Sequence, residues 1–160
     1  YHAPLVIDAD ALNILNENKT FLDFLPKNSI LTPHLKEFER LFGTSSNYFE
    51  RLELQKQVSI KYQVFIILKG AHTCITSPEG FTFFNSTGNP GMSTGGSGDV
   101  LTGVITALLA QQYSSLEACL IGVFMHGLSG DLAVNELGEQ SLCASDIIDF
   151  LPKAFMRITK

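Results

Sequence analysis

The chain has 160 residues, of which 45% are hydrophobic and 17% are charged, and it carries a formal net charge of −5. This composition is typical of one globular domain with a hydrophobic core, and it excludes a disordered chain. The negative charge and the absence of a basic block argue against a nucleic-acid partner, and we expect no signal peptide and no membrane-spanning segment. Three widely spaced cysteines indicate free thiols in a reducing cytoplasm.

The first part of the chain alternates between short apolar runs and helical patterns. Residues 4–7 and 29–31 are predicted to form strands of a parallel sheet, and residues 11–17 are predicted to form a helix after the first strand. Ligands bind at the carboxyl ends of strands in open α/β sheets, so Asp10 and Asn13 are candidate neighbours of a site. For Asp10, a cap at the start of the helix is the more favoured interpretation.

A second helix is predicted to start at the sequence Thr-Pro-His-Leu-Lys-Glu, which begins at Thr32. Pro33 suits the first turn of a helix and Thr32 can cap it, while the apolar residues of segment 35–42 fall on one face. On composition alone, a histidine at a helix start is more often structural or exposed than functional, so His34 is only a candidate. Residues 48–62 are predicted to form an amphipathic covering helix without chemistry.

The clearest buried strand is predicted at residues 64–68, where five apolar residues are rich in strand formers. It ends in Lys69, which a glycine follows. A lysine beside a glycine at a strand end can hold a phosphate, although a solvated loop lysine is the commoner case. Residues 74–77 and 81–84 are then predicted to form a β-hairpin that leads into a glycine-rich segment.

The segment from residue 85 to residue 103, NSTGNPGMSTGGSGDVLTG, contains six glycines and runs into an apolar helical pattern at residues 101–110. A glycine-rich loop that opens a helix binds anions, because the first-turn N–H groups lack partners within the helix. Glycine also lets the backbone approach a phosphate closely. The segment has neither the pattern of a Walker A loop nor that of a dinucleotide-binding loop.

Asp99 is the single acid in this segment, and two interpretations of it carry about equal weight. A carboxylate repels a phosphate, but a site that deprotonates an attacking hydroxyl needs a base there. The N–H groups of about Gly96 to Gly98 would then hold the transferring phosphoryl group while Asp99 accepts the proton. Alternatively, Asp99 is only a first-turn acid that interacts favourably with the helix dipole.

The sequence Ser-Ser-Leu-Glu, which starts at Ser114, is a capping box that opens a long helix. Its predicted apolar stripe consists of Leu116, Leu120, Val123, Phe124 and Leu128. His126 and Asp131 lie within this mostly apolar helix, and we interpret them as structural because buried polar groups are usually satisfied partners.

Three glycines of the predicted helices are expected to let another element pack closely: Gly103, Gly127 and Gly130. The last helix is predicted over residues 146–158, with Ser145 as its cap, and Pro152 is expected to kink or shorten it.

The segment NPGMSTGGSGDVLTG resembles the signature of the NAD(P)H-hydrate dehydratases of the ribokinase-like superfamily, and the match is long and specific. The sequences DADALN, Thr-Pro-His and His-Gly-x-x-Gly-Asp also resemble segments of that family. Where the family usually continues the second of these as Pro-Gly-Glu, this chain has Leu35-Lys36-Glu37. The resemblance implies an α/β, ribokinase-like fold with a mostly parallel sheet flanked by helices.

The resemblance also implies an activity and the residues that carry it. The family uses ADP or ATP to dehydrate hydrated NADH or NADPH, by phosphorylating the hydrate hydroxyl and eliminating phosphate, and such a step normally needs Mg²⁺. Asp99 would be catalytic and contact the hydrated nicotinamide, which His34 and Asn13 would also bind. The residues that would bind the nucleotide are Lys69, Gly70, Ala71, His72, Thr73, Gly95, Gly96, Ser97 and Gly98. No metal ligand is identifiable.

The resemblance covers nearly all of this chain, whereas the chain covers only the C-terminal part of the family's domain. We therefore expect residues 1–160 to be one domain that is truncated at its N-terminus. We expect it either to form homo-oligomers through an exposed sheet edge and apolar surface or to be found with its missing half. Two alternatives stay open: a small-molecule kinase for a vitamin precursor or sugar, and a nucleotide-binding fragment that cannot turn over. The Thr-Pro-His and NPGM sequences favour the dehydratase over the kinase.

Overall fold

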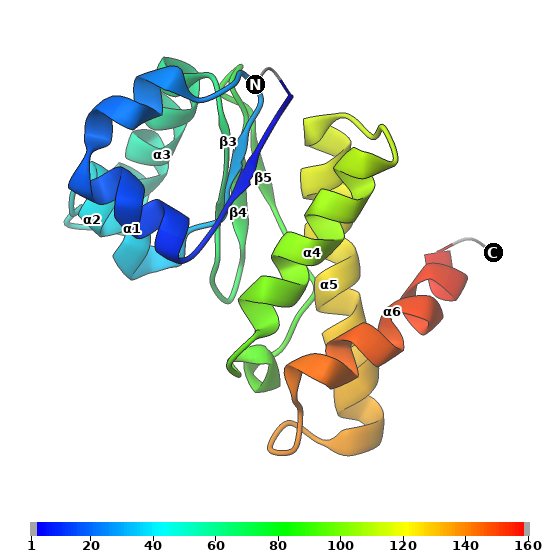
Figure 1. Ribbon diagram of the computed structural model, residues 1–160. Coiled ribbons are helices and arrows are strands. Elements are labelled where there is room, and N and C mark those ends of the chain that lie inside the picture. The colour runs from blue at the N-terminus through cyan, green and yellow to red at the C-terminus, as the bar shows by residue number, and fades with distance from the viewer. Residues whose placement is uncertain (1–2, 159–160) are drawn as a thin grey trace.

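The computed structural model describes residues 3–158, which form a central sheet between two layers of helices (Figure 1). The strands are β1 (Val6–Ile7), β2 (Ile30–Leu31), β3 (Phe65–Leu68), β4 (Cys74–Thr76) and β5 (Thr82–Phe84). The α-helices are α1 (Asp10–Glu17), α2 (Leu35–Phe42), α3 (Tyr48–Tyr62), α4 (Ser97–Ala110), α5 (Ser115–Leu137) and α6 (Ala144–Ile158). Two 3₁₀ helices are η1 (Lys19–Phe24) and η2 (Pro90–Met92).

The sheet has the strand order β1-β2-β3-β4-β5 in the described residues. The pairs β1–β2 and β2–β3 are parallel, whereas β3–β4 and β4–β5 are antiparallel. Strand β3 therefore joins a parallel half to a hairpin, which confirms the predicted α/β class and the predicted hairpin. The parallel half places the ends of β1, β2 and β3 at one edge, where ligands bind in open α/β sheets.

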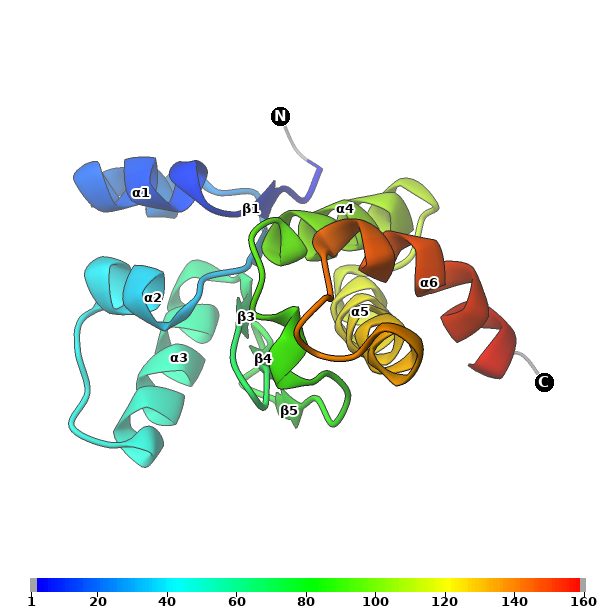
Figure 2. The same cartoon turned by 90° about the horizontal axis from the view of Figure 1, so that it is seen from below.

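Two hydrophobic cores lie on opposite faces of this sheet (Figure 2). Leu31 and Ile66 belong to the core beneath α1, α2 and α3, whereas their neighbours Ile30 and Ile67 belong to the core beneath α4 and α5. This division follows from the period of two in a strand, which turns successive side chains to opposite faces. All four side chains are fully buried, and each contributes about 1.5–3 kcal/mol.

Helix α5 is buried mainly by small residues and by only part of the predicted stripe. Val123 is buried as predicted, whereas Leu116 and Phe124 are each 37% exposed, so the prediction was wrong for these two residues. A Cβ at Gly122 would lie 2.9 Å from Ile105 Cγ1 of α4, so the glycine is what permits this close approach. The sequence pattern missed this face because small residues contribute little to a hydrophobic stripe.

Helix α5 is also long and apolar enough to cross a membrane by length and composition, which sequence analysis did not anticipate. Within the 18-residue window that passes this test, 56% of the residues are buried inside the structure, and the helix contacts α4 and α6. The core helix of a soluble protein passes the same test of length and composition, so this finding is weak evidence for a membrane span.

The helix starts differ from several predicted caps. Helix α2 is capped by His34 rather than Thr32, whose hydroxyl instead donates to Ile7 O at 3.3 Å within the sheet. Helix α1 is capped by Ala9 without a side-chain hydrogen bond, so Asp10 is its first residue and not its cap. Helix α6 begins at Ala144, before Ser145. Gly103 faces open space, which contradicts its predicted role in close packing.

Candidate active site

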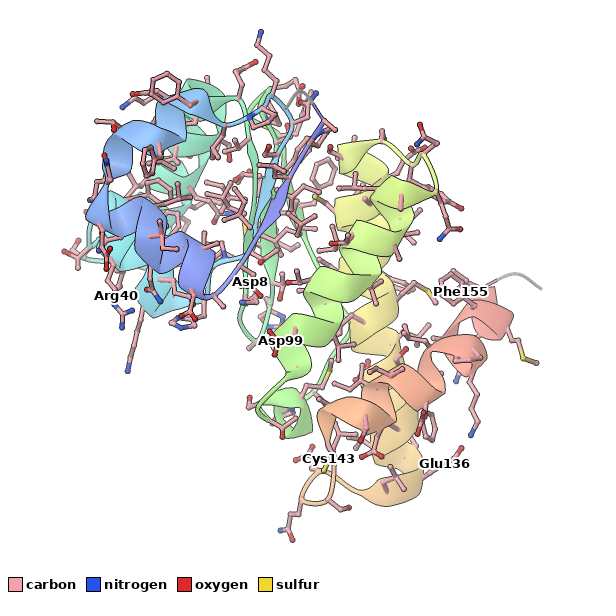
Figure 3. All side chains as sticks on the ribbon, in the orientation of Figure 1. Asp8, Arg40, Asp99, Glu136, Cys143 and Phe155 are labelled. Carbon is pink, nitrogen blue, oxygen red and sulfur yellow. The ribbon has the colours of Figure 1, made fainter. Side chains whose placement is uncertain are left out.

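A cavity of about 770 Å³ with both polar and apolar walls lies where the ends of β1 and β3 face the start of α4. Figure 3 shows Asp8 and Asp99 on this side of the molecule, one from the sheet and the other from α4. His34, Lys69 and the loop that precedes α4 also line the cavity. Segments that are far apart in the sequence therefore meet at one site.

The glycine-rich loop opens α4 directly into this cavity, as the sequence predicted, but the helix begins at Ser97 rather than at residue 101. Its N-cap is Gly96, which has a φ of 88°, a backbone conformation that residues with a side chain rarely adopt. Asp99 is an exposed acid in the first turn. The first-turn N–H groups have no partners inside the helix, so this end of α4 offers donors and positive potential to an anion.

Helix α5 supports the glycine-rich loop that precedes α4. The Asp131 carboxylate accepts hydrogen bonds from Gly88 N at 2.9 Å and from Asn89 Nδ2 at 2.8 Å. A Cβ at Gly127 would lie 2.7 Å from the carbonyl carbon of Thr87, and one at Gly130 would lie 2.7 Å from a side-chain carbon of Met92. The predicted close packing at both glycines and the structural role of Asp131 are therefore confirmed.

His126 joins α5 to the first residue of α4. Its Nε2 lies 2.9 Å from Ser97 O and 3.4 Å from Ser97 Oγ. Burial lowers the pKa of His126 and the positive charge of Lys69 lowers it further, while the hydrogen bond to Ser97 acts in the opposite direction. The ring is therefore neutral at pH 7, and it also lines the cavity. The mostly apolar sequence around His126 predicts a structural role for it, and no sequence pattern places it at the site.

His34 and Lys69 lie beside each other at the ends of neighbouring strands. They form an isolated parallel bridge, and Lys69 N donates to Pro33 O at 2.9 Å. His34 also forms a capping box, because its Nδ1 accepts from Glu37 N while Glu37 Oε2 accepts from His34 N. The box fixes the start of α2 and holds the exposed His34 ring at the cavity.

The Lys69 ammonium pairs with Asp8, which sequence analysis did not select. Lys69 Nζ lies 2.7 Å from Asp8 Oδ1, and Thr102 Oγ1 of α4 donates to Asp8 Oδ2 at 2.9 Å. Burial raises the pKa of Asp8, but the bonds to Lys69 and Thr102 more than offset this, so the pKa lies below its usual value. The signal was available, because Asp8 directly follows β1 at the carboxyl edge of the sheet.

Most of the predicted site residues lie together around this cavity. Those that line it are His34, Lys69, Gly70, Ala71, Thr73, Gly96, Ser97, Gly98 and Asp99. His72 and Gly95 belong to the same two segments but do not line the cavity. Asn13 is also outside it, and its Oδ1 accepts a hydrogen bond from Arg40 Nη1 at 3.2 Å on the surface.

Residues 3–158 contain no group of three or more His, Cys, Asp or Glu side chains that could hold a metal ion. Both carboxylate oxygens of Asp8 already have partners. Magnesium keeps several waters and is commonly held by substrate phosphates with one or two carboxylates. These residues therefore form no dedicated magnesium site.

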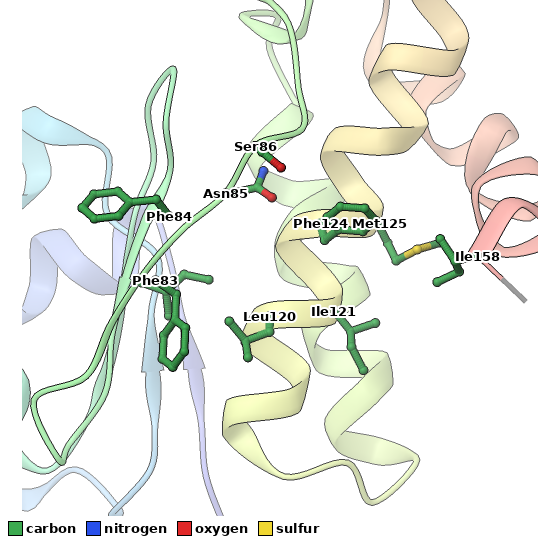
Figure 4. A pocket seen from close by; sticks show the side chains of 10 residues that line it. Phe83, Phe84, Asn85, Ser86, Leu120, Ile121, Phe124, Met125 and Ile158 are labelled. Atoms are coloured by element: carbon green, nitrogen blue, oxygen red, sulfur yellow. The ribbon is translucent and has the colours of Figure 1, made fainter.

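A second cavity, of about 330 Å³, lies between β5 and α5 (Figure 4). Phe83, Leu120, Ile121 and Phe124 form its apolar walls, and its lining contains no titratable side chain. It therefore lacks groups for acid–base chemistry, which concentrates the candidate chemistry in the larger cavity.

Comparisons with known proteins agree with this arrangement. The bifunctional NAD(P)H-hydrate repair enzyme of Moorella thermoacetica is 42% identical over 151 residues, which are 93% of this chain and 28% of that protein. The crystal structure of ADP/ATP-dependent NAD(P)H-hydrate dehydratase from Bacillus subtilis, co-crystallised with ATP and Mg²⁺, has a TM-score of 0.83 and 33% identity. The match covers 96% of the present chain and 55% of the Bacillus subtilis chain.

The ribokinase-like fold is confirmed by a further structure, that of a ribokinase-like superfamily protein from Enterococcus faecalis. It has a TM-score of 0.80 and 30% identity, and the match covers 96% of this chain and 52% of that one. The family model for NAD(P)H-hydrate dehydratase matches residues 1–153. The chain therefore belongs to the NAD(P)H-hydrate dehydratase family.

Proposed function

We propose that the protein dehydrates hydrated NADH or NADPH in a reaction driven by ADP or ATP. The observation that carries this proposal is the start of α4, where donor N–H groups and the Asp99 carboxylate share a cavity with His34 and Lys69. Membership of the family supports the substrate. The chain spans 55% of the Bacillus subtilis dehydratase and 28% of the Moorella thermoacetica enzyme. The activity of the whole protein is therefore part of the proposal.

In this reaction Asp99 accepts the proton of the hydrate hydroxyl as that oxygen attacks the terminal phosphoryl group. The bond from phosphorus to the hydrate oxygen forms, and the bond to the nucleotide oxygen breaks. The N–H groups at the start of α4 stabilise the charge on the phosphoryl oxygens. The carbon–oxygen bond to the phosphate then breaks with the electron pair on the phosphate, the neighbouring ring carbon loses a proton to solvent, and the double bond of the reduced nicotinamide forms.

The two substrates approach the start of α4 from different elements. The nucleotide contacts the segments that start at Lys69 and Gly95, and the hydrated nicotinamide contacts His34. When bound with the nucleotide, Mg²⁺ would be held mainly by the nucleotide phosphates and water, and it would offset part of the negative charge of those phosphates.

The test is recovery of absorbance at the reduced-nicotinamide band when the protein is mixed with hydrated NADH, Mg²⁺ and ADP or ATP. We expect recovery that requires the nucleotide and that falls at least about a hundredfold in Asp99→Asn. Asp146→Asn, a change at a half-buried first-turn acid of α6 whose side chain accepts a hydrogen bond from Cys143 N, is the matched control and should retain the wild-type rate, because asparagine can still accept that bond. Parallel reactions with ADP and ATP identify the phosphoryl donor.

The other outcomes separate the alternatives. Nucleotide consumption with a vitamin precursor or a sugar, but not with the hydrate, would support a small-molecule kinase instead. Binding of ADP without any turnover would mean that this chain is an incomplete nucleotide-binding part. An Asp99→Asn variant with the wild-type rate would remove Asp99 from the mechanism.

We also propose that the protein forms homo-oligomers in the cytoplasm. Large apolar side chains are exposed beside the edge strand β5, among them Phe81 and Phe84, and such surface favours association. Sedimentation velocity over a wide concentration range tests this, and a monomer at every concentration would contradict it. Buried free thiols at Cys74 and Cys119 support a reducing compartment, which cell fractionation would check.

A further inference from the structure

Lys69 is held at the cavity by contacts from two other elements. Its ammonium contacts Asp8 Oδ1 at 2.7 Å, and the two side chains are 22% and 8% exposed. The second oxygen of Asp8 accepts from Thr102 Oγ1, one turn beyond Asp99 on α4. The lysine at the end of β3 is therefore tied through the carboxylate at the end of β1 to the helix that bears the proposed base.

The pair lies directly against the first turn of α4. A Cβ on Gly98 would lie 3.3 Å from Lys69 Nζ and 3.7 Å from Asp8 Oδ2. The ammonium therefore stands next to backbone donors that a phosphoryl group would contact. A Cβ at position 98 would crowd the ammonium, which gives the last glycine of the Gly-Gly-Ser-Gly sequence a specific role.

Lys69 places its ammonium beside the positive end of a helix. The start of a helix carries roughly half a positive charge, and Lys69 adds a full charge beside it, which the Asp8 carboxylate partly offsets. A lysine side chain has four flexible carbons and many rotamers, so without partners its ammonium would sample many positions. The charge of Lys69 also lowers the pKa of His126, so its field reaches the residue that contacts Ser97.

We propose that Asp8 and Thr102 are positioning residues that hold Lys69 Nζ at the start of α4, where it stabilises the charge on the transferring phosphoryl group. The inference rests on the proposed function and deepens it. Lys69 keeps its proton throughout, because Asp99 accepts the proton of the hydroxyl. The ammonium acts only through its charge and its hydrogen bonds to the phosphoryl oxygens.

Asp8→Asn should lower kcat by about tenfold to a hundredfold, since a misplaced catalytic group costs up to about a hundredfold. The KM for nucleotide should not rise, because the change also removes a negative charge beside bound phosphate. Thr102→Val should give a smaller fall in kcat, and Thr106→Val is its matched control. Thr106 lies one turn further along α4, is exposed and bonds only to its own helix, so its kcat should be unchanged.

A double-mutant cycle distinguishes positioning of Lys69 by Asp8 from a purely structural role of Asp8. If Asp8 acts through Lys69, Asp8→Asn should have little further effect on kcat in a Lys69→Met background. Equal effects in both backgrounds, or a rise in nucleotide KM that parallels a fall in stability, would overturn the proposal. Rescue of part of kcat by Lys69→Arg would support a role for the positive charge.

The proposed function and this inference fail in different ways. Wild-type turnover that is unchanged in Asp8→Asn would overturn the inference alone. If the wild-type protein binds ADP without turnover, the proposed function fails, and the ADP dissociation constant decides the inference. Lys69→Met must then raise that constant at least about tenfold, and its effect must couple to Asp8→Asn. Lys56→Met, at a lysine paired with Glu53 on α3, should leave the constant unchanged.

Discussion

At the scale of single residues, His126 shows how burial connects the site to the stability of the protein. Its ring contacts the carbonyl of Ser97, at the point where the glycine-rich loop becomes α4. Burial, with the charge of Lys69, lowers its pKa in the folded protein. In the unfolded chain the same ring titrates at about pH 6.5, so the unfolded state binds more protons as the pH falls.

This difference predicts the pH dependence of unfolding. The contribution of His126 is present in full above about pH 6.5 and is lost as the pH falls from there through the lower folded-state pKa. We expect the free energy of unfolding of the wild-type protein to fall over that window relative to His126→Gln, whose amide can still donate to Ser97 O but does not titrate. Urea unfolding of both proteins across the window measures the difference, and a difference that is independent of pH would contradict the prediction.

At the scale of elements, α5 holds the glycine-rich loop through a surface that only glycine allows. A Cβ at Gly127 would lie 2.7 Å and 2.9 Å from the carbonyl carbon and Cβ of Thr87, so the loop backbone would have to move. Thr87 Oγ1 also donates to Phe124 O at 2.9 Å, which ties the loop to the same helix. A substitution on this surface of α5 should therefore change the position of the loop that leads into the start of α4.

Gly127→Ala should destabilise the protein by about 1–3 kcal/mol, the usual cost of overpacking, and should weaken ADP binding. Gly103→Ala is the matched control, because position 103 is also helical but faces open space. Alanine there should stabilise the protein by up to about 1 kcal/mol and leave ADP binding unchanged. Urea unfolding measures the change in stability, and calorimetric ADP titration measures the change in binding. Similar results for the two variants would refute the role of Gly127 in supporting the glycine-rich loop.

The element scale also shows what sequence could and could not predict. Period-two and period-3.6 patterns predicted the order of strands and helices, and the unusual glycine content located the loop at the start of α4. The contact between Thr102 and Asp8 joins residues 94 positions apart, so no local pattern contains it. Gly103 and Gly127 were both predicted to permit close packing, because the sequence shows that a Cβ is absent but not which atoms that Cβ would contact.

At the scale of the whole molecule, the cavity is shared by the two halves that the sheet joins. Asp8, His34 and Lys69 lie at the ends of strands or at the start of α2, whereas Ser97 and Asp99 lie on α4 in the opposite helical layer. The two cores also share β2 and β3, whose alternate residues fill both. Loss of either core should therefore disrupt the other, which is the condition for cooperative unfolding.

The protein should accordingly unfold in a single thermal transition that adenine nucleotide shifts as a whole. A ligand at about 100 times its dissociation constant adds about 2.7 kcal/mol of stability, which corresponds to roughly 5–10 °C in Tm for a chain of this size. Differential scanning calorimetry with and without ADP measures the shift, and Lys69→Met at the same ADP concentration should show a smaller one. Two separate transitions, only one of which responds to ADP, would show that the halves unfold independently and that the nucleotide contacts only one of them.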